Sequence, residues 1–180
     1  MRRGLNLLAT LAIVCSSASA AEKGQFCWPM HFAGVVLGVS QEPHVQRLLG
    51  QGFLRSEPPD RTRIYIDSKR TATLRVTMVT DTIVGEVSIA NGIDSAIPSA
   101  DLTRASSKFF DPLEGFGNWH ALKLGSTKAE VLKNLGEPKE RKTPDDWVYE
   151  SRCVEDLPQF FTLHFRNGRI SKVVFSAPPG

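Results

Sequence analysis

The sequence predicts an α+β fold of two tandem modules, each a short helix (or helices) packed on a three-stranded antiparallel meander. The stretch LKLGSTKAEVLKNLGEP at 122–138 has a weaker copy, VLGVSQEPHVQRLLGQ, at 36–51. Segments that alternate apolar and polar residues follow both copies, as expected for strands with one buried and one solvent-exposed face. Similar patterns after both copies favour an internal repeat over the alternative, two unrelated amphipathic helices.

The second copy contains a helix whose two ends are both specified. Thr127 can cap the first turn, and Glu130, three residues later, can reach back to complete a capping box. Gly136 supplies the residue that ends the helix, and Pro138 prevents its continuation. We therefore expect a two-turn helix over 128–135, too short to be stable without docking on the strands that follow.

The first copy repeats this pattern less clearly. Ser40 is the expected cap, and Gly50 is the expected stop. Val45, Leu48 and Leu49 form the apolar side that should dock on the strands.

The strands that follow each helix are expected to form an antiparallel meander. Gly52 and two prolines predict a loop over 51–60, and Pro98 precedes an expected linker helix within 97–110. Asn167-Gly168 is a strong signal for a two-residue hairpin turn. The expected strands cover 62–67, 71–80 and 83–90 in the first module and 146–152, 159–166 and 169–177 in the second.

Alternation assigns a face to each strand residue. In the first strand, Ile64 and Ile66 are expected on the core side, and Arg63 and Tyr65 on the free side. The residues predicted on the free face of the later strands are Arg75, Glu86, His164, Arg166 and Lys172. Trp147 and Tyr149 share one face of their strand, which is either the core side or the exposed side.

These motifs resemble the SmpA/OmlA (BamE-like) module, in a tandem arrangement similar to the repeats of beta-lactamase inhibitor proteins. The resemblance implies a protein-binding function, in which the open sheet face is the contact surface. The BamE-like module further implies an accessory role in cell-envelope assembly or homeostasis. The residues that carry the match are Leu122, Leu124, Gly125, Thr127, Val131, Leu135, Gly136, Pro138, Tyr149, Asn167 and Gly168.

The first twenty residues have the features of a secretory signal. Two arginines precede an apolar run, and Ala18-Ser19-Ala20 is a small-residue cleavage site. BamE-like proteins are lipoproteins, and Cys15 offers the alternative of a lipid anchor, but Val14 does not fit a lipobox. We expect a periplasmic or secreted protein. The expected segments are the signal peptide 1–20, the first module 21–92, a linker 93–117 that includes the linker helix, and the second module 118–180.

The mature chain is nearly neutral. Without Arg2 and Arg3 it holds 20 basic and 19 acidic residues, a net charge of +1. This balance gives no general field for nucleic acid, and no apolar run is long enough to span a bilayer. Its two cysteines, Cys27 and Cys153, predict a disulfide in an oxidising compartment. A reactive thiol is the alternative.

No catalytic, cofactor or metal motif stands out. The sequence has no GxSxG, HExxH, phosphate loop or paired CxxC. Its histidines, His31, His44, His120 and His164, are scattered, and Asp145-Asp146 is typical of an exposed turn. The sequence therefore predicts no enzyme, no cofactor and no bound metal, and a small enzyme is the alternative hypothesis.

The prediction that remains is an exported module that binds another protein. The alternative function is a proteinaceous inhibitor of a secreted or periplasmic hydrolase, and the alternative for the free face is a solvated sheet surface. Arginine, tyrosine and tryptophan are enriched at binding hot spots. The residues predicted to contact the partner are Tyr65, Arg75, Trp147, Tyr149, His164 and Arg166.

Overall fold

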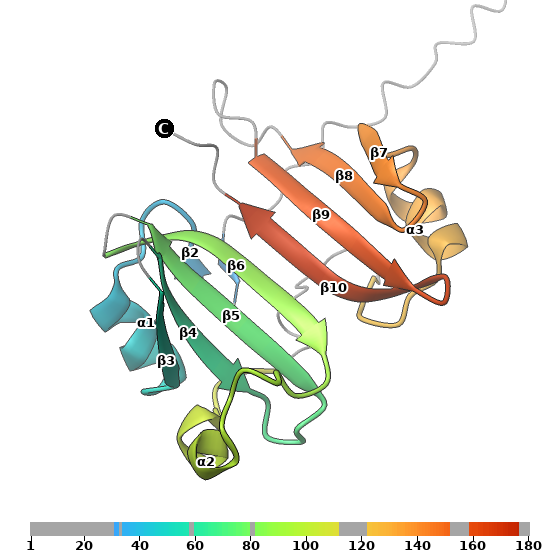
Figure 1. Ribbon diagram of the computed structural model, residues 1–180. Coiled ribbons are helices and arrows are strands. Elements are labelled where there is room, and N and C mark those ends of the chain that lie inside the picture. The colour runs from blue at the N-terminus through green and yellow to red at the C-terminus, as the bar shows by residue number, and fades with distance from the viewer. Residues whose placement is uncertain are drawn as a thin grey trace, which may run out of the picture.

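The computed structural model describes residues 31–32, 34–57, 60–79, 82–111, 122–151 and 159–176. Within these ranges the strands form one antiparallel eight-stranded sheet in the order β3-β4-β5-β6-β10-β9-β8-β7, and a separate hairpin, β1-β2 (Figure 1). The strands are β1 (His31–Phe32), β2 (Val35–Val36), β3 (Phe53–Glu57), β4 (Asp60–Ile66), β5 (Ala72–Val79), β6 (Ile83–Asn91), β7 (Glu140–Thr143), β8 (Asp146–Ser151), β9 (Gln159–Arg166) and β10 (Arg169–Ser176). The helices are α1 (Glu42–Leu49), the 3-10 turn η1 (Ser99–Asp101), α2 (Leu102–Ala105) and α3 (Lys128–Leu135).

The continuous sheet corrects the predicted fold class. Strand β6 pairs with β10 from Lys172↔Ala90 to Ser176↔Glu86. The first half of the sheet (β3–β6) and the second half (β7–β10) therefore share one hydrogen-bonded ladder. Figure 1 shows β3–β6 and β7–β10 meeting at this junction. The prediction of two tandem helix-on-meander modules is therefore wrong, because the main element is a single sheet with three short helices in the described part of the chain.

The two edge strands were missed by the sequence prediction. Residues 53–57 were expected to be loop, but β3 pairs with β4 in a register that includes Phe53↔Ile64. Strand β7 is entirely exposed and carries only polar side chains. An edge strand has one neighbour, so its sequence pattern is weak, and polar residues there protect the edge against aggregation.

Helix α3 forms as predicted, and α1 does so only in part. Thr127 and Glu130 make both bonds of the capping box, and Gly136 ends the helix with φ +75°. Helix α1 instead begins after Gln41, whose side chain makes no cap bond. Ser40, the expected cap, accepts a hydrogen bond from the Val36 amide at 2.9 Å, and its Oγ lies 3.3 Å from His44 Nδ1 of α1. It therefore joins the preceding strand to a side chain of the helix and does not cap a backbone amide of α1.

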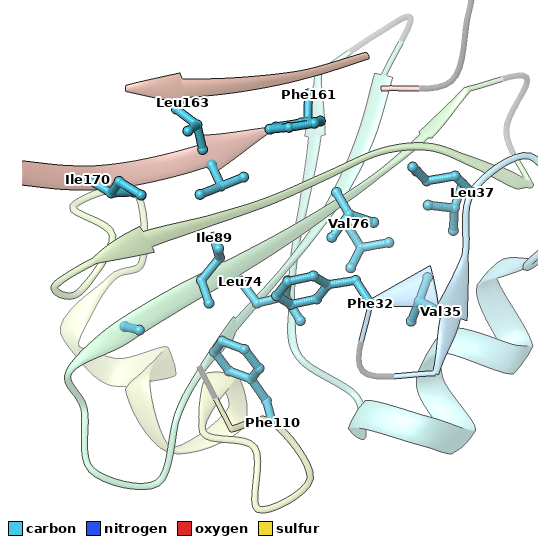
Figure 2. Packing of buried hydrophobic residues seen from close by; sticks show 14 of the residues in the cluster. Phe32, Val35, Leu37, Leu74, Val76, Ile89, Phe110, Phe161, Leu163 and Ile170 are labelled. Atoms are coloured by element: carbon cyan, nitrogen blue, oxygen red, sulfur yellow. The ribbon is translucent and has the colours of Figure 1, made fainter. Parts of the chain in front are cut away.

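The main core lies on the face of the sheet that α1 and α3 cover. Figure 2 shows Leu74 and Ile89 from the first half and Phe161 and Leu163 from the second, all within one cluster with Phe32. The cluster runs across the β6–β10 junction, so burial stabilises the two halves together. Burying each such side chain contributes about 1.5–3 kcal/mol.

Strand β4 has the opposite orientation to the one predicted. Tyr65 is fully buried in the main core, opposite Leu74 in register. Ile64 and Ile66 face the other side, where they form a smaller cluster with Ile97. Both faces of β4 are covered, because the η1–α2 segment packs over the second face, and alternation alone cannot then identify the core side.

The linker helix is shorter than expected. It ends at Ala105, and Phe109, within the expected helical range, lies beyond its end and is 67% exposed. Beyond it, the amide of Ser107 donates to the carbonyl of Ile66 at 2.8 Å, which fixes the linker against β4.

No helix in the described ranges is long and apolar enough to cross a membrane. The part of the chain that the structure describes contains no disulfide bond, and Cys27 and Cys153 both lie outside it. The structure therefore gives the predicted bond no support. The predicted signal segment 1–20 also lies outside the described residues.

Candidate functional site

Three of the six predicted contact residues are in the core. Tyr65 is fully buried, and Trp147 and Tyr149 are 4% and 6% exposed. The Tyr149 ring stacks on Phe161 with centroids 5.1 Å apart. Burial raises the pKa of Tyr65 to about 12 and also raises that of Tyr149, since the phenolate form is disfavoured without water. These aromatic residues stabilise the fold and are not available to a partner.

The other three predicted residues lie on the opposite face, which we call the polar face. Its side chains come from β5, β6, β10, β9 and β8, on the positions that alternate with the main core. Arg75 and His164 are half-exposed there, and Arg166 is exposed. Arg75 is on β5 of the first half, and His164 and Arg166 lie two residues apart on β9 of the second half, so the sheet brings all three to one surface.

A cavity of about 320 Å³ lies on the polar face, where the two halves meet. We call it the junction pocket. Strands β5 and β6 supply its first side, the turn after β6 its second, and Lys172 of β10 its third. The residues that line it are Thr73, Arg75, Ser88, Ala90, Asn91, Gly92, Ile93, Asp94, Ser95 and Lys172.

The turn after β6 is fixed by hydrogen bonds to β5. The hydroxyl of Thr73 donates to the Gly92 carbonyl at 2.7 Å and accepts from the Asp94 amide at 3.0 Å. The Arg75 Nε donates to Asp94 Oδ2, and the amide of Ala96 donates to Oδ1 at 2.9 Å. The pocket wall is thus formed before any ligand arrives.

The charge of Asp94 depends on these bonds. Its side chain is 7% exposed. Burial pushes its pKa up, but the hydrogen bonds from Arg75 and from the Ala96 amide outweigh that effect and hold the pKa below its usual value. Asp94 is therefore ionised near neutral pH and neutralises one unit of positive charge at the pocket.

Two lining groups have no bonding partner in the described part of the chain. Ser88 is 2% exposed, and its hydroxyl makes no hydrogen bond to the described residues. Lys172 is half-exposed and forms no ion pair with them. A buried hydroxyl without a partner costs about 1–3 kcal/mol, and such groups are rare in folded proteins.

A second polar group lies beside the pocket. Lys172 is the register partner of His164, and His164 Nδ1 lies 2.6 Å from Asp146 Oδ1. Hydrogen bonds from Thr143 and His164 lower the pKa of Asp146. Within the described ranges no serine, threonine or cysteine side chain is hydrogen-bonded to the His164 ring, so this pair lacks the third member of a nucleophilic triad.

Another cavity of about 320 Å³ opens at the end of the sheet, on the other side of Asn91. Lys69, Lys108 and Asp111 lie at it, and Phe110 forms an apolar wall. Asp67 in its lining is already bonded by the Thr71 and Ala72 amides. In the described ranges no group of three or more His, Cys, Asp or Glu side chains could hold a metal ion.

The sequence prediction missed Asp94, Ser88 and the turn after β6. Asp94 lies in the expected linker 93–117, and its bond to Arg75 joins residues 19 positions apart. The one signal available was Arg75 in the middle of a strand, because a half-buried arginine needs a carboxylate partner. Lys172 was correctly placed on the polar face.

Comparison with known proteins gives little further information. A scan against family models finds no match, and a search of curated proteins finds no similar sequence. A solved structure of a DUF4309 family protein (YjgB) from Bacillus subtilis is 15% identical, with a TM-score of 0.49, covering 81% of this chain and 83% of that one. A likeness at this level does not establish function.

These findings correct the expected resemblance. No family model matches the chain, and its single continuous sheet is not the tandem arrangement of helix-on-meander modules that the resemblance implies. The short helical motif that suggested the resemblance is a local pattern, with a cap, an apolar side and a glycine stop, which unrelated folds can share.

Proposed function

We propose that the mature chain is an exported protein that binds another protein through the polar face of its sheet. Export is supported by the signal-like segment 1–20. The observation that carries the binding proposal is the contrast between the two faces of the sheet. One face holds the main core under α1 and α3, and the other carries polar side chains across the junction of the two halves.

The polar face has the size that a protein partner needs. Strands lie about 4.8 Å apart, and residues advance about 3.3 Å along each strand. The polar face covers five strands of about eight residues each: β5, β6, β10, β9 and β8. Their flat area is therefore roughly 600 Å², to which the protruding side chains add further surface. Stable interfaces bury about 800 Å² per partner, so strands from both halves are needed.

The chemistry of this face also favours a specific contact. Arg75 and Arg166 present guanidinium groups from the two halves. Val174 of β10, a strand that lies between those of the two arginines, is the register partner of Thr162 on β9. A mixture of arginine, hydroxyl and aliphatic groups is typical of a non-obligate interface. The inhibitor and envelope-assembly roles depended on the corrected resemblance, and no contact in the structure favours either one.

A capture experiment with paired variants tests the proposal. The mature protein is immobilised, and bound proteins from the secreted and envelope fractions of the producing organism are identified by mass spectrometry. The test variant is the double substitution Arg75→Gln and Arg166→Gln. The control is Arg47→Gln and Lys133→Gln, which removes two exposed cations from the last turns of α1 and α3.

We expect the wild type and the control to retain one saturable partner that the polar-face variant loses. Melting curves of the two variants verify that both are folded at the assay temperature. Equal capture by both variants would place the contact elsewhere, and loss only in the control would place it on the helical side. Failure of the wild type to retain any saturable partner contradicts the proposal.

A further inference from the structure

We propose that the junction pocket is a binding site for a carboxylate group, carried either by a small organic acid or by the C-terminus of a peptide. This site stands on its own lining residues and goes beyond the protein-binding function proposed above. Its chemistry is measured with small probes, so it does not require a protein partner.

The first element of the site is the free side of the Arg75 guanidinium. Its Nε is bonded to Asp94, and its two terminal nitrogens have no partner in the described part of the chain. Asp94 therefore fixes the plane of the group while the terminal N–H groups remain available. A guanidinium can donate two parallel hydrogen bonds to the two oxygens of a carboxylate.

The second element is the pair of unpartnered groups, Ser88 and Lys172. The Ser88 hydroxyl lines the pocket, is almost completely buried, and has no hydrogen-bond partner among the described residues. Buried hydroxyls are nearly always satisfied by protein, water or a ligand, so this hydroxyl is free to bond a ligand atom that replaces water in the pocket. The Lys172 ammonium comes from the neighbouring half of the sheet and adds a charge that no described carboxylate neutralises.

The charge and size of the pocket select the class of ligand. Among the residues that line the pocket, Arg75 and Lys172 contribute two positive charges and Asp94 one negative charge, a net charge of +1 that suits a monoanion. Arg55 also lowers the pKa of Asp94 but does not line the pocket. Ala90 and Ile93 provide apolar wall for a short hydrocarbon part. A volume of about 320 Å³ is at the small end of ligand pockets. A dianion such as phosphate would keep an unneutralised charge there.

The site is preorganised, which lowers the entropy lost on binding. Thr73 holds both Gly92 and Asp94 in place, and Thr73 is itself 4% exposed within the sheet. The remaining wall belongs to strands β6 and β10, which are joined by a regular ladder from Lys172 to Ser176.

The test is a titration of the ¹⁵N-labelled mature protein, followed by amide chemical shifts at constant ionic strength. The probe is N-acetylglycine, with the neutral N-acetylglycinamide and inorganic phosphate as comparison probes. We expect N-acetylglycine to give saturable shifts around Ser88, Asn91 and Lys172, and the neutral amide to give none. Phosphate is expected to bind at least tenfold more weakly.

Three variants connect the binding to the pocket. Lys172→Met should weaken N-acetylglycine at least tenfold, and Ser88→Ala should weaken it several-fold. Lys133→Met removes an exposed lysine of α3 and is the control, with no expected change. The ¹⁵N spectrum of each variant shows whether its fold is intact.

The outcomes separate the sources of the carboxylate. The site binds a peptide C-terminus if a short peptide with a free C-terminus binds more than tenfold tighter than N-acetylglycine. Amidation of that peptide should then remove the added affinity. If the peptide and N-acetylglycine bind with equal affinity, the site is assigned to a small organic acid. Equal shifts with the neutral amide, equal binding of phosphate, or unchanged binding in Lys172→Met would each overturn the proposal.

Discussion

The two halves of the sheet hold their helices with the same tyrosine hydrogen bond but with different arrangements of charged side chains. In the first half the Tyr65 hydroxyl donates to the Gly50 carbonyl at the end of α1, at 3.2 Å. In the second half the Tyr149 hydroxyl donates to the Gly136 carbonyl at the end of α3, at 3.1 Å. Both bonds satisfy a carbonyl that a helix end leaves without an intrahelical partner.

The difference lies in the charges beneath and around each helix. Under α1, the buried Glu42 carboxylate accepts from Arg63 Nε at 2.7 Å and also pairs with Arg61 at 3.1 Å. Around α3 the charges are more exposed: Lys128 lies 5.6 Å above the Trp147 ring and pairs with Asp145 at 2.6 Å. The first half therefore depends on a buried ion pair, and the second on aromatic packing with charges at its rim.

This contrast predicts unequal sensitivity to loss of a charge. Breaking a buried pair leaves an uncompensated buried charge, which costs about 3–5 kcal/mol. We expect Glu42→Ala to lower the free energy of unfolding by this amount, because Arg63 stays buried. Lys128→Ala should cost about 0.5–1 kcal/mol. Urea melts of the two variants measure the difference, and similar losses would remove the contrast between the halves.

The pocket wall should show a pH-dependent contribution. The pKa of Asp94 is lowered in the folded state, so its charge stabilises the fold above the unfolded pKa and loses that effect as the pH falls through the folded value. Asp94→Asn should cost about 1–3 kcal/mol at pH 7. The gap to wild type should begin to narrow below about pH 4 and should continue to narrow as the pH falls toward the lowered folded pKa, and chemical melts from pH 7 to pH 3 measure it. A gap that is constant with pH would contradict the ionic role.

The hydrogen bond from a tyrosine to the glycine carbonyl at the helix end, which both halves have, can be tested by removing each hydroxyl. Tyr65→Phe and Tyr149→Phe each remove one hydroxyl and retain the ring in the core. Each should cost about 1 kcal/mol, because one glycine carbonyl loses its donor. A twofold larger loss in one variant would show that the two attachments are not equivalent.

The two helix caps predict changes of stability of opposite sign, each of about 1 kcal/mol or less. Thr127→Ala should cost about 1 kcal/mol, because it removes the capping box of α3. Gln41→Ser should stabilise by about 0.5–1 kcal/mol, because α1 has no side-chain cap bond at that position. Thermal melts measure both effects: a lower melting temperature for Thr127→Ala and a higher one for Gln41→Ser would confirm the assignment of the two caps.

Local signals in the sequence predicted local structure well. The bounds of α3 and its capping box were predicted, and Asn167 and Gly168 have the positive φ values that the hairpin signal requires, 54° and 71°. Both features depend on residues only a few positions apart. Their physical causes, a cap bond and a turn conformation, are contained within the segment itself.

Non-local features were not predictable in the same way. The β6–β10 pairing and the cover that η1–α2 places over Ile64 and Ile66 depend on distant segments. Without them, Tyr65 was assigned to the wrong face of β4. For the site, Arg75 and Lys172 follow from alternation, but Asp94 does not, because it reaches the sheet from a turn.

The most direct test of the account is the affinity of the captured partner for two single variants, Arg75→Gln in the first half and Arg166→Gln in the second. The central claim is that the joined halves form one contact surface on the polar face. It predicts that each substitution weakens the dissociation constant at least fivefold, about 1 kcal/mol, while the Arg47→Gln and Lys133→Gln control is unchanged. If the partner binds either single variant as tightly as the wild type, the surface does not extend across the β6–β10 junction, and the claim is contradicted.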